Sequence, residues 1–476
     1  MLWICTDQQR FDTLGCNGNE FVTTPNLDRL AERGTLFEHT YSQSPVCTPS
    51  RAGFLTGRYP RTTRARQNGQ SIPADETLIT RVLANAGYLC GLSGKLHLSA
   101  SYPDIAPVAE PRIDDGYNIF HWSHHPPHIR PDFQANQYTL WLRQQGHSYQ
   151  TRPHPGSDHV LEGMPAELHH TTWCVEMAKD FITGQAPESD PWLFSLNIFD
   201  PHNAFDPPAE YLAPYLDRLD EIPLPNYVEG ELEPKPAFQQ MDHDSTTPKP
   251  YGIRYDGLSD REHRLLRASY WAMCDLIDVH IGELLDTLEA TGQADNTLVI
   301  FMSDHGEMLG DHGIYLKGPY FYDPAIRVPL IVSWPGRLPE GARVAELVEL
   351  DDIAPTILDA AGVSHPPGLQ AESLWPLLTG ATEVHRKDIY CEYYNAKPWH
   401  KDPTAQLTCV RTARYKLVAV HGRDEGELYD LEADPGETHN RWWDPAYRNV
   451  KLEMYERLTD RIAWTVDPLP LRQADW

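Results

Sequence analysis

Residues 297–305 read Thr297-Leu298-Val299-Ile300-Phe301-Met302-Ser303-Asp304-His305, an apolar run that stops at an acidic and an imidazole side chain. The segment before it has a helical pattern: Ser259 and Glu262 form a capping box, and apolar residues then recur three and four positions apart as far as Leu288. A helix followed directly by a buried strand is typical of α/β proteins. We therefore expect a helix and then a core strand in this part of the chain.

Two further apolar runs have the same form. Residues 2–6 end at Asp7, and residues 192–199 end at Asp200-Pro201-His202. In open α/β sheets, ligands bind beyond the carboxyl ends of the strands. We therefore expect the side chains that follow the three runs to contribute to one site.

The fold class that these patterns predict is α/β, with a large, mostly parallel central sheet flanked by helices. Between about Ser101 and Pro250 the chain is rich in Pro, His and Asp with little periodicity, so we expect long surface loops and short elements there. After Gly380 the pattern changes to short strands and a final helix. We divide the chain into a larger domain that carries the site, residues 1–380, and a smaller C-terminal α+β domain with a short antiparallel sheet, residues 381–476.

The charge of the chain argues against one large class of partners. Its 40 Lys and Arg residues and 68 Asp and Glu residues give a net charge of -28, which would repel the phosphate backbone of a nucleic acid. No apolar stretch reaches the ~20 residues that span a bilayer, so we expect no membrane segment. No basic and apolar leader is visible, so we expect a cytoplasmic protein, or a periplasmic or secreted one if the natural N-terminus is longer. The eight cysteines show no paired spacing and are expected to be reduced thiols.

One short stretch carries the most specific signal. Cys47-Thr48-Pro49-Ser50-Arg51, followed by Thr56-Gly57-Arg58, has the pattern Cys-x-Pro-x-Arg with a later Thr-Gly-Arg. This pattern resembles the signature of the type I sulfatases, which belong to the alkaline phosphatase superfamily. Further segments similar to that family occur in the family's order: Asp7-Gln8, Gly94-Lys95-Leu96-His97, Pro201-His202, Ser303-Asp304-His305-Gly306-Glu307, Leu316-Lys317-Gly318 and Leu428-Tyr429-Asp430-Leu431.

The resemblance implies an alkaline-phosphatase-like fold and the hydrolysis of a sulfate monoester, of a carbohydrate or of an aryl or alkyl alcohol, to the alcohol and inorganic sulfate. Cys47 would be oxidised by a formylglycine-generating enzyme to formylglycine (3-oxoalanine), whose hydrate is the nucleophile. In the family's mechanism Asp304 is the base for the attack. His202, with Lys317, protonates the departing oxygen, and His97 then removes the remaining hydroxyl proton. The catalytic residues that the resemblance implies are Cys47, Arg51, Lys95, His97, His202 and Lys317.

The residue types also suit this chemistry on their own. A sulfate ester needs cations and hydrogen-bond donors around its oxygens, and the Arg and Lys residues of the motifs supply positive charge. Asp7 and Asp304, both at strand ends, can converge on one hard divalent cation, and Gln8 adds a carbonyl oxygen. His305 completes the implied metal set and softens it, so we expect Ca²⁺, with Mn²⁺ and Mg²⁺ as alternatives.

Two departures from the commonest sulfatase pattern keep an alternative open. Gln8 and His305 replace the usual Asp and Asn, and this pairing resembles a branch that includes phosphonate monoester hydrolases. Lys95 and His97 match the sulfatases, whereas those hydrolases carry neutral hydroxyl side chains there. We therefore favour a sulfated small molecule or carbohydrate as substrate over a phosphonate monoester or phosphodiester. A third hypothesis is a non-catalytic protein that binds sulfate esters and keeps Cys47 as a thiol.

A second group of residues invites a metal hypothesis that the spacing does not support. His121, His124, His125 and His128 surround Pro126-Pro127, without the helical His-x-x-x-His spacing of a zinc site. We expect a substrate loop or a surface segment there. The alcohol released stays open, because the region between residues 101 and 250 matches no motif.

Overall fold

The structure, a computed structural model, describes residues 1–102, 105–106, 108–126, 136–186, 190–244, 252–395, 404–472 and 474. Within these residues the largest sheet has nine strands, in the order β11-β2-β10-β8-β1-β7-β3-β4, with β9 paired to β2. Their bounds are β1 (Leu2–Thr6), β2 (Thr35–Tyr41), β3 (Leu89–Gly94), β4 (Ile119–Trp122), β7 (Trp192–Asn197), β8 (Val299–Ser303), β9 (Arg327–Val328), β10 (Leu330–Ser333) and β11 (Ala342–Glu349).

The centre of this sheet is parallel. Strand β1 pairs in parallel with β7 on one side and β8 on the other, with Leu2 opposite both Phe194 and Val299. Strands β3 and β4 continue the parallel order beyond β7. On the other side β10 runs antiparallel between β8 and β2. The carboxyl ends of β1, β7 and β8 therefore lie side by side at one edge of the sheet, as the three apolar runs predict.

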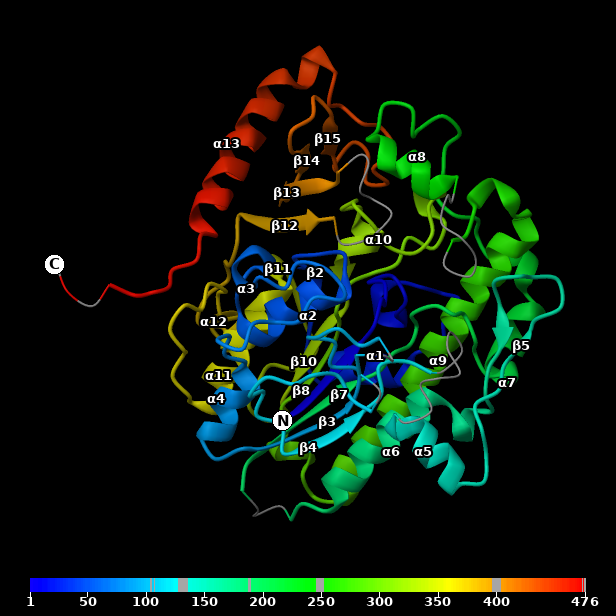
Figure 1. Cartoon of the computed structure of the whole chain (residues 1–476), viewed down its shortest axis with the longest axis vertical. Coiled ribbons are helices and arrows are strands. Elements are labelled where there is room, and N and C mark those ends of the chain that lie inside the picture. The colour runs from blue at the N-terminus through cyan, green and yellow to red at the C-terminus, as the bar shows by residue number, and fades with distance from the viewer. Residues whose placement is uncertain are drawn as a thin grey trace.

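Helices cover both faces of the sheet (Figure 1). Successive side chains of a strand point to opposite faces, and β1 shows the result: Trp3 and Cys5 are buried in one core, Leu2 and Ile4 in the other. The first core includes residues of α2 (Cys47–Thr56), α4 (Ile79–Asn85) and α11 (Ile353–Ala361). The second includes residues of α1 (Pro25–Glu32), α6 (His170–Thr183) and α9 (Asp260–Ala290).

Helix α9 begins as the sequence predicts. The Ser259 side chain accepts a hydrogen bond from the backbone N–H of Glu262, whose carboxylate accepts one from the backbone of Ser259. The expectation of loops and short elements between residues 101 and 250 is wrong at α6, a helix of 14 residues. Its positions 170–175 are all buried, so the first half of the helix lacks the alternation of polar and apolar faces that makes a helix recognisable from sequence. The other helices of that region are short: α5 (Gln137–Gln144), α7 (Ala209–Leu216) and α8 (Ala237–His243).

A second, four-stranded antiparallel sheet follows the large one along the chain (Figure 1). Its strands are β12 (Asp388–Tyr394), β13 (Gln406–Thr412), β14 (Tyr415–Val420) and β15 (Gly426–Asp430), and α13 (Arg448–Trp464) packs against it. The predicted fold class, a large mostly parallel sheet plus a small antiparallel one, is confirmed. The domain boundary at residue 380 stays a prediction.

The small sheet is tied to the large unit by buried charges. Lys416 of β14 is fully buried, and its Nζ lies 2.7 Å from Asp323 Oδ1, 2.7 Å from Glu437 Oε1 and 2.9 Å from the Phe321 carbonyl oxygen. The remaining short elements are α3 (Pro60–Thr63), α10 (Asp323–Ile326), α12 (Trp375–Leu378), β5 (Arg152–Pro153) and β6 (Leu161–Glu162). In the part of the chain that the structure describes, no helix is long and apolar enough to cross a bilayer. All eight cysteines are free.

Candidate active site

Predicted site residues that follow two strands, and one from a helix, meet at the carboxyl edge of the large sheet. Asp7 follows β1 directly, Asp304 and His305 follow β8, and Cys47 is the first residue of α2. All four are fully or almost fully buried. Cys47 Sγ lies 3.1 Å from His305 Nε2 and 3.6 Å from Asp7 Oδ1. The sheet register thus places side chains about 300 positions apart in the chain within contact distance.

Arg51 connects the nucleophile helix to both carboxylates. It lies one turn after Cys47 on α2, and its Nε donates to Asp304 Oδ2 at 2.8 Å. Its Nη2 is 3.6 Å from Asp7 Oδ2, and its Nη1 donates to the carbonyl oxygen of Lys95 at 2.8 Å. The guanidinium is buried, so it balances negative charge with little screening by water. Arg51 therefore holds Asp7, Asp304 and the Lys95 segment in fixed relation to Cys47.

Two lysines surround the Cys47 side chain with positive charge. Lys317 Nζ lies 3.0 Å from Cys47 Sγ, and Lys95 Nζ forms an ion pair with Asp7. Burial raises the pKa of the Cys47 thiol, but Lys317, Lys95 and His305 outweigh burial and hold this pKa well below its ordinary value. Position 47 is therefore an environment that stabilises an anionic group.

Both predicted proton-transfer histidines reach Cys47. The side chains of His97 and His202 are each within hydrogen-bonding contact of it. Burial, reinforced by the charge of Lys95, lowers the pKa of His97 to about 4. Burial and Lys317 also lower the pKa of His202, whose Nδ1–H donates to the Asn203 carbonyl oxygen at 2.5 Å. Both rings are therefore neutral near pH 7, and His202 presents Nε2 as its acceptor.

Glu110 holds His97 in place and was not predicted. His97 has a positive φ of 59°, an unfavourable conformation for a residue with a side chain. Its backbone N–H and that of Leu98 donate to the two carboxylate oxygens of Glu110, each at 2.8 Å, and Trp122 Nε1 donates to the same carboxylate at 3.0 Å. Glu110 is not part of any motif quoted above, so the sequence offers no signal for this role.

A second unpredicted residue, Glu307, orients the amide of Gln8. The Nε2 of Gln8 donates to Glu307, and its Oε1 accepts from Lys317 Nζ at 2.5 Å. Glu307 also accepts hydrogen bonds from the backbone N–H groups of Leu309 and Leu316. It therefore fixes which end of the Gln8 amide faces Lys317 and anchors the segment that precedes Lys317. Glu307 lies in the Ser303–Glu307 motif, which was the only signal for it.

The donor set fits a divalent cation. Ligand atoms of Asp7, Cys47, Asp304 and His305 all lie within 4.8 Å of one another, and His305 Nε2 is 3.8 Å from an oxygen of each carboxylate. Two atoms bound to one ion at about 2.3 Å can be at most about 4.6 Å apart, so the 3.8 Å separations are compatible with a shared ion. Two carboxylates with an imidazole and a nearby amide oxygen form an oxygen-rich set. The residues therefore suit the metal that the resemblance implies, although the identity of the ion is open.

Asp200, which ends the third apolar run, turns away from this site. Its carboxylate accepts a hydrogen bond from Thr171 Oγ1 at 2.5 Å and lies 3.4 Å from His169 Nδ1, instead of contacting Cys47. Only its carbonyl oxygen takes part, as acceptor for the backbone N–H of Asp7 at 3.3 Å. The third run therefore contributes His202 to the site but not the Asp200 carboxylate.

The histidine cluster of the sequence divides into two parts. The rings of His97 and His124 lie 4.3 Å apart between centroids, and His125 lies 5.9 Å from Phe199, so His124 and His125 border the site. His121 instead contacts Gln137 Oε1 through Nδ1 at 2.9 Å. His128 lies outside the described residues.

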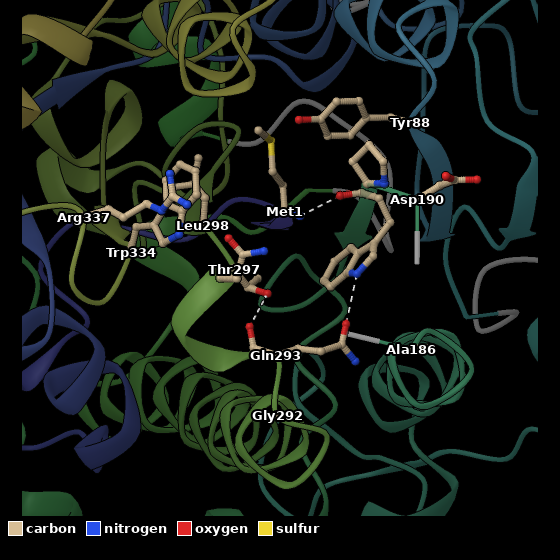
Figure 2. A pocket seen from close by; sticks show the side chains of 13 residues that line it. Met1, Tyr88, Ala186, Asp190, Gly292, Gln293, Thr297, Leu298, Trp334 and Arg337 are labelled. Carbon is tan, nitrogen blue, oxygen red and sulfur yellow. Dashed lines mark hydrogen bonds between the residues drawn. The ribbon is translucent and has the colours of Figure 1, made fainter. Parts of the chain in front are cut away.

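A cavity at the opposite edge of the sheet does not belong to this site. It has a volume of about 290 Å³ and lies where β1, β7 and β8 begin (Figure 2). The Met1 amino group donates to the Trp192 carbonyl oxygen at 2.6 Å, and Trp192 Nε1 donates to Gln293 Oε1 at 3.0 Å. Neither of the two groups of candidate metal ligands among the described residues lies there.

Comparisons with known proteins agree with the geometry. The sequence pattern of the family described as sulfatase matches residues 1–363, and that described as N-sulphoglucosamine sulphohydrolase, C-terminal, matches residues 310–463. An arylsulfatase of Clostridium perfringens is 31% identical over 92% of this chain and 89% of its own length. An N-acetylglucosamine-6-O-sulfatase of Bacteroides thetaiotaomicron is 25% identical over 97% and 85%, respectively. The solved structure of a phosphonate monoester hydrolase from Silicibacter pomeroyi superposes with a TM-score of 0.83 at 27% identity, covering 98% of this chain and 96% of that one.

Proposed function

The chain belongs to the sulfatase family of the alkaline phosphatase superfamily, and from this premise we propose that it hydrolyses a sulfate monoester to an alcohol and inorganic sulfate. One observation carries the proposal: Cys47 lies among two lysines, two neutral imidazoles and two buried carboxylates. A monoanionic ester with its sulfur above position 47 would meet positive charge on its oxygens and a proton carrier on either side.

The nucleophile of the proposal is derived from Cys47. Conversion of Cys47 to formylglycine by a maturation enzyme would supply a hydrated aldehyde with two hydroxyl groups, one to attack sulfur and one to eliminate sulfate afterwards. The low pKa of Cys47 in this structure supports the assignment, because the lysines that stabilise a thiolate would equally stabilise an alkoxide at that position.

The surrounding residues divide the proton transfers between them. His202 is neutral, with its Nδ1 proton held by the Asn203 carbonyl, so its Nε2 would first take up a proton, which the negative charge of a bound ester favours. It would then pass this proton to the departing alcohol, with Lys317 neutralising the charge that develops on the oxygen. His97, neutral and in contact with position 47, would accept the proton of the remaining hydroxyl. Arg51 and Lys95 would hold the two carboxylates in place and attract the sulfate oxygens.

Asp7, Gln8, Asp304 and His305 would hold one divalent cation, which supplies Lewis acidity toward the sulfate oxygens and the nucleophile. We propose Ca²⁺ because three of the four ligands offer oxygen, with Mn²⁺ and Mg²⁺ as the alternatives.

A phosphonate monoester hydrolase is the second candidate. The solved phosphonate monoester hydrolase that superposes at a TM-score of 0.83 favours it, as does the Gln8 and His305 pairing. Lys95 and His97 favour a sulfate ester. Both side chains lie near position 47 and can hold a proton, whereas phosphonate monoester hydrolases are expected to carry neutral hydroxyl side chains there.

The deciding experiment compares 4-nitrophenyl sulfate with 4-nitrophenyl phenylphosphonate, using purified enzyme produced with a formylglycine-generating enzyme. We expect a higher kcat/KM for the sulfate, and a clear preference for the phosphonate would overturn the assignment. The mass of the tryptic peptide Gly34–Arg51 should show an aldehyde in place of the Cys47 thiol in the same preparation. An unmodified thiol in an active preparation would contradict the proposed nucleophile.

A further inference from the structure

Five rings form a continuous arc beside position 47. Successive ring centroids are 4.3 Å apart for His97 and His124, 4.9 Å for His124 and His125, 5.9 Å for His125 and Phe199, and 4.6 Å for Phe199 and His202. The two ends of the arc, His97 and His202, both contact Cys47. The arc therefore borders one side of the nucleophile, and it includes the histidine proposed to protonate the leaving alcohol. The alcohol portion of a substrate must lie against these rings.

The arc contains buried ring nitrogens without hydrogen bonds. Both ring nitrogens of His124 and the Nδ1 of His97 are shielded from solvent and have no partner among the described residues. His124 as a whole is partly exposed. A buried polar group without a partner destabilises a protein, and such groups are seldom found unless a water or ligand completes them. Three such atoms in two neighbouring rings beside the candidate nucleophile point to a ligand that forms hydrogen bonds.

The charges around the arc restrict the kind of ligand. Burial, together with the positive charge of Lys95, keeps the pKa of His97, His124 and His125 below the ordinary histidine value, so the rings are uncharged near pH 7. A neutral imidazole offers one donor and one acceptor, as a hydroxyl group does. Lys95 Nζ lies 5.4 Å from the centroid of Phe199, so the aromatic face that could hold a cationic alcohol already has a positive neighbour.

We propose that His124 is a specificity residue that binds a hydroxyl group of the alcohol portion, so that the enzyme selects neutral, polyhydroxylated sulfate esters over aryl and cationic ones. The proposal rests on the proposed function, since it assigns the leaving group of the same reaction. His124 touches the substrate but not the reacting sulfur, so its removal changes the choice of alcohol and not the chemistry.

The test uses His124→Phe, which keeps a planar ring against His97 and removes both nitrogens. Steady-state kcat/KM is measured for a panel of glucose monosulfates and for 4-nitrophenyl sulfate, which has no hydroxyl beside the ester. We expect His124→Phe to lower kcat/KM for the best glucose monosulfate about tenfold or more, and to change that for 4-nitrophenyl sulfate less than threefold. His124→Gln, which retains a donor and an acceptor, should recover part of the loss.

His121→Phe is the matched control, because His121 lies just before His124 in the chain but contacts Gln137 instead of the arc. It should leave both substrates unchanged. An equal loss on both substrates in His124→Phe, or a wild-type enzyme that cleaves no glucose monosulfate, would overturn the inference. If the enzyme prefers phosphonates, the same alcohols are presented as phosphonate monoesters: a selective loss then supports the role of His124 while the sulfate assignment fails.

Discussion

Replacing Lys416 with Met should weaken the packing of the small sheet against the segment that follows Lys317, and so lower the stability of the protein. The change removes the ammonium group that contacts Asp323, Glu437 and the Phe321 carbonyl, and it keeps most of the apolar stem. Removing one partner from a buried charge group destabilises a protein by about 3–5 kcal/mol, since the remaining charges stay buried and unpaired. Arg327 lies 3.5 Å from Asp323 and offsets part of the loss there, whereas Glu437 loses its close cation. We therefore expect a loss of about 3–4 kcal/mol in the free energy of unfolding.

The assay is urea denaturation followed by tryptophan fluorescence, with Lys179→Met as the matched control. Lys179 pairs with Glu176 and Glu283 at the partly exposed surface, where an ion pair contributes at most about 1 kcal/mol. The double variant Lys416→Met/Glu437→Gln should recover part of the loss, because it removes the carboxylate left unpaired. If Lys416→Met loses no more than Lys179→Met, the buried charges do not hold the two sheets together.

Four further changes test the site and its support. Cys47→Ala should abolish turnover with an unchanged melting temperature; a collapse of the fold would show that Cys47 serves packing instead. Asp304→Ala should lose both metal, measured by mass spectrometry of the digested protein, and activity, and full metal content would contradict the ligand role. Glu307→Gln should weaken metal affinity about tenfold or more, measured by chelator competition, because Gln8 loses the acceptor that orients its amide; unchanged affinity would refute this. Burial raises the pKa of Asp275 to about 7, above the ordinary 3.8, so the folded protein binds more protons than the unfolded one between these values and stability falls as pH rises through this window. Asp275→Asn should therefore flatten the melting temperature against pH between pH 5 and 7, and an unchanged slope would argue against a protonated Asp275.

The parts of the fold and site that could be predicted depend on local patterns. The three apolar runs place Asp7, His202 and Asp304 at one sheet edge, because parallel strands end together. Arg51 follows Cys47 by one helical turn, so its reach toward the same edge is also local information. The resemblance to the sulfatases supplied the lysines, which no periodicity marks.

The parts that could not be predicted depend on contacts between distant side chains. Glu307 orients Gln8 across 299 positions, and Glu110 supports His97 from a loop without periodic pattern. The direction in which the Asp200 side chain turns depends on Thr171 of α6, a helix that the sequence pattern did not reveal. Such pairings are set by tertiary packing, and a single sequence contains no period that reports them.

The alternation of β1 between two cores has a consequence for how this enzyme can change over time. Thr6 and Ser303 are direct partners in the sheet, so the pairing of β1 with β8 sets the distance between Asp7 and Asp304. The same pairing places Trp3 and Ile4 on opposite faces of the sheet. Loss of one residue from β1 would exchange the two faces and shift Asp7 by about 3.3 Å, which would break the core and the chemistry together. Substitutions at His124 and His125, which follow the edge strand β4, can therefore be accepted more easily than shifts of the residues that follow β1 and β8, whose positions depend on the packing of the sheet.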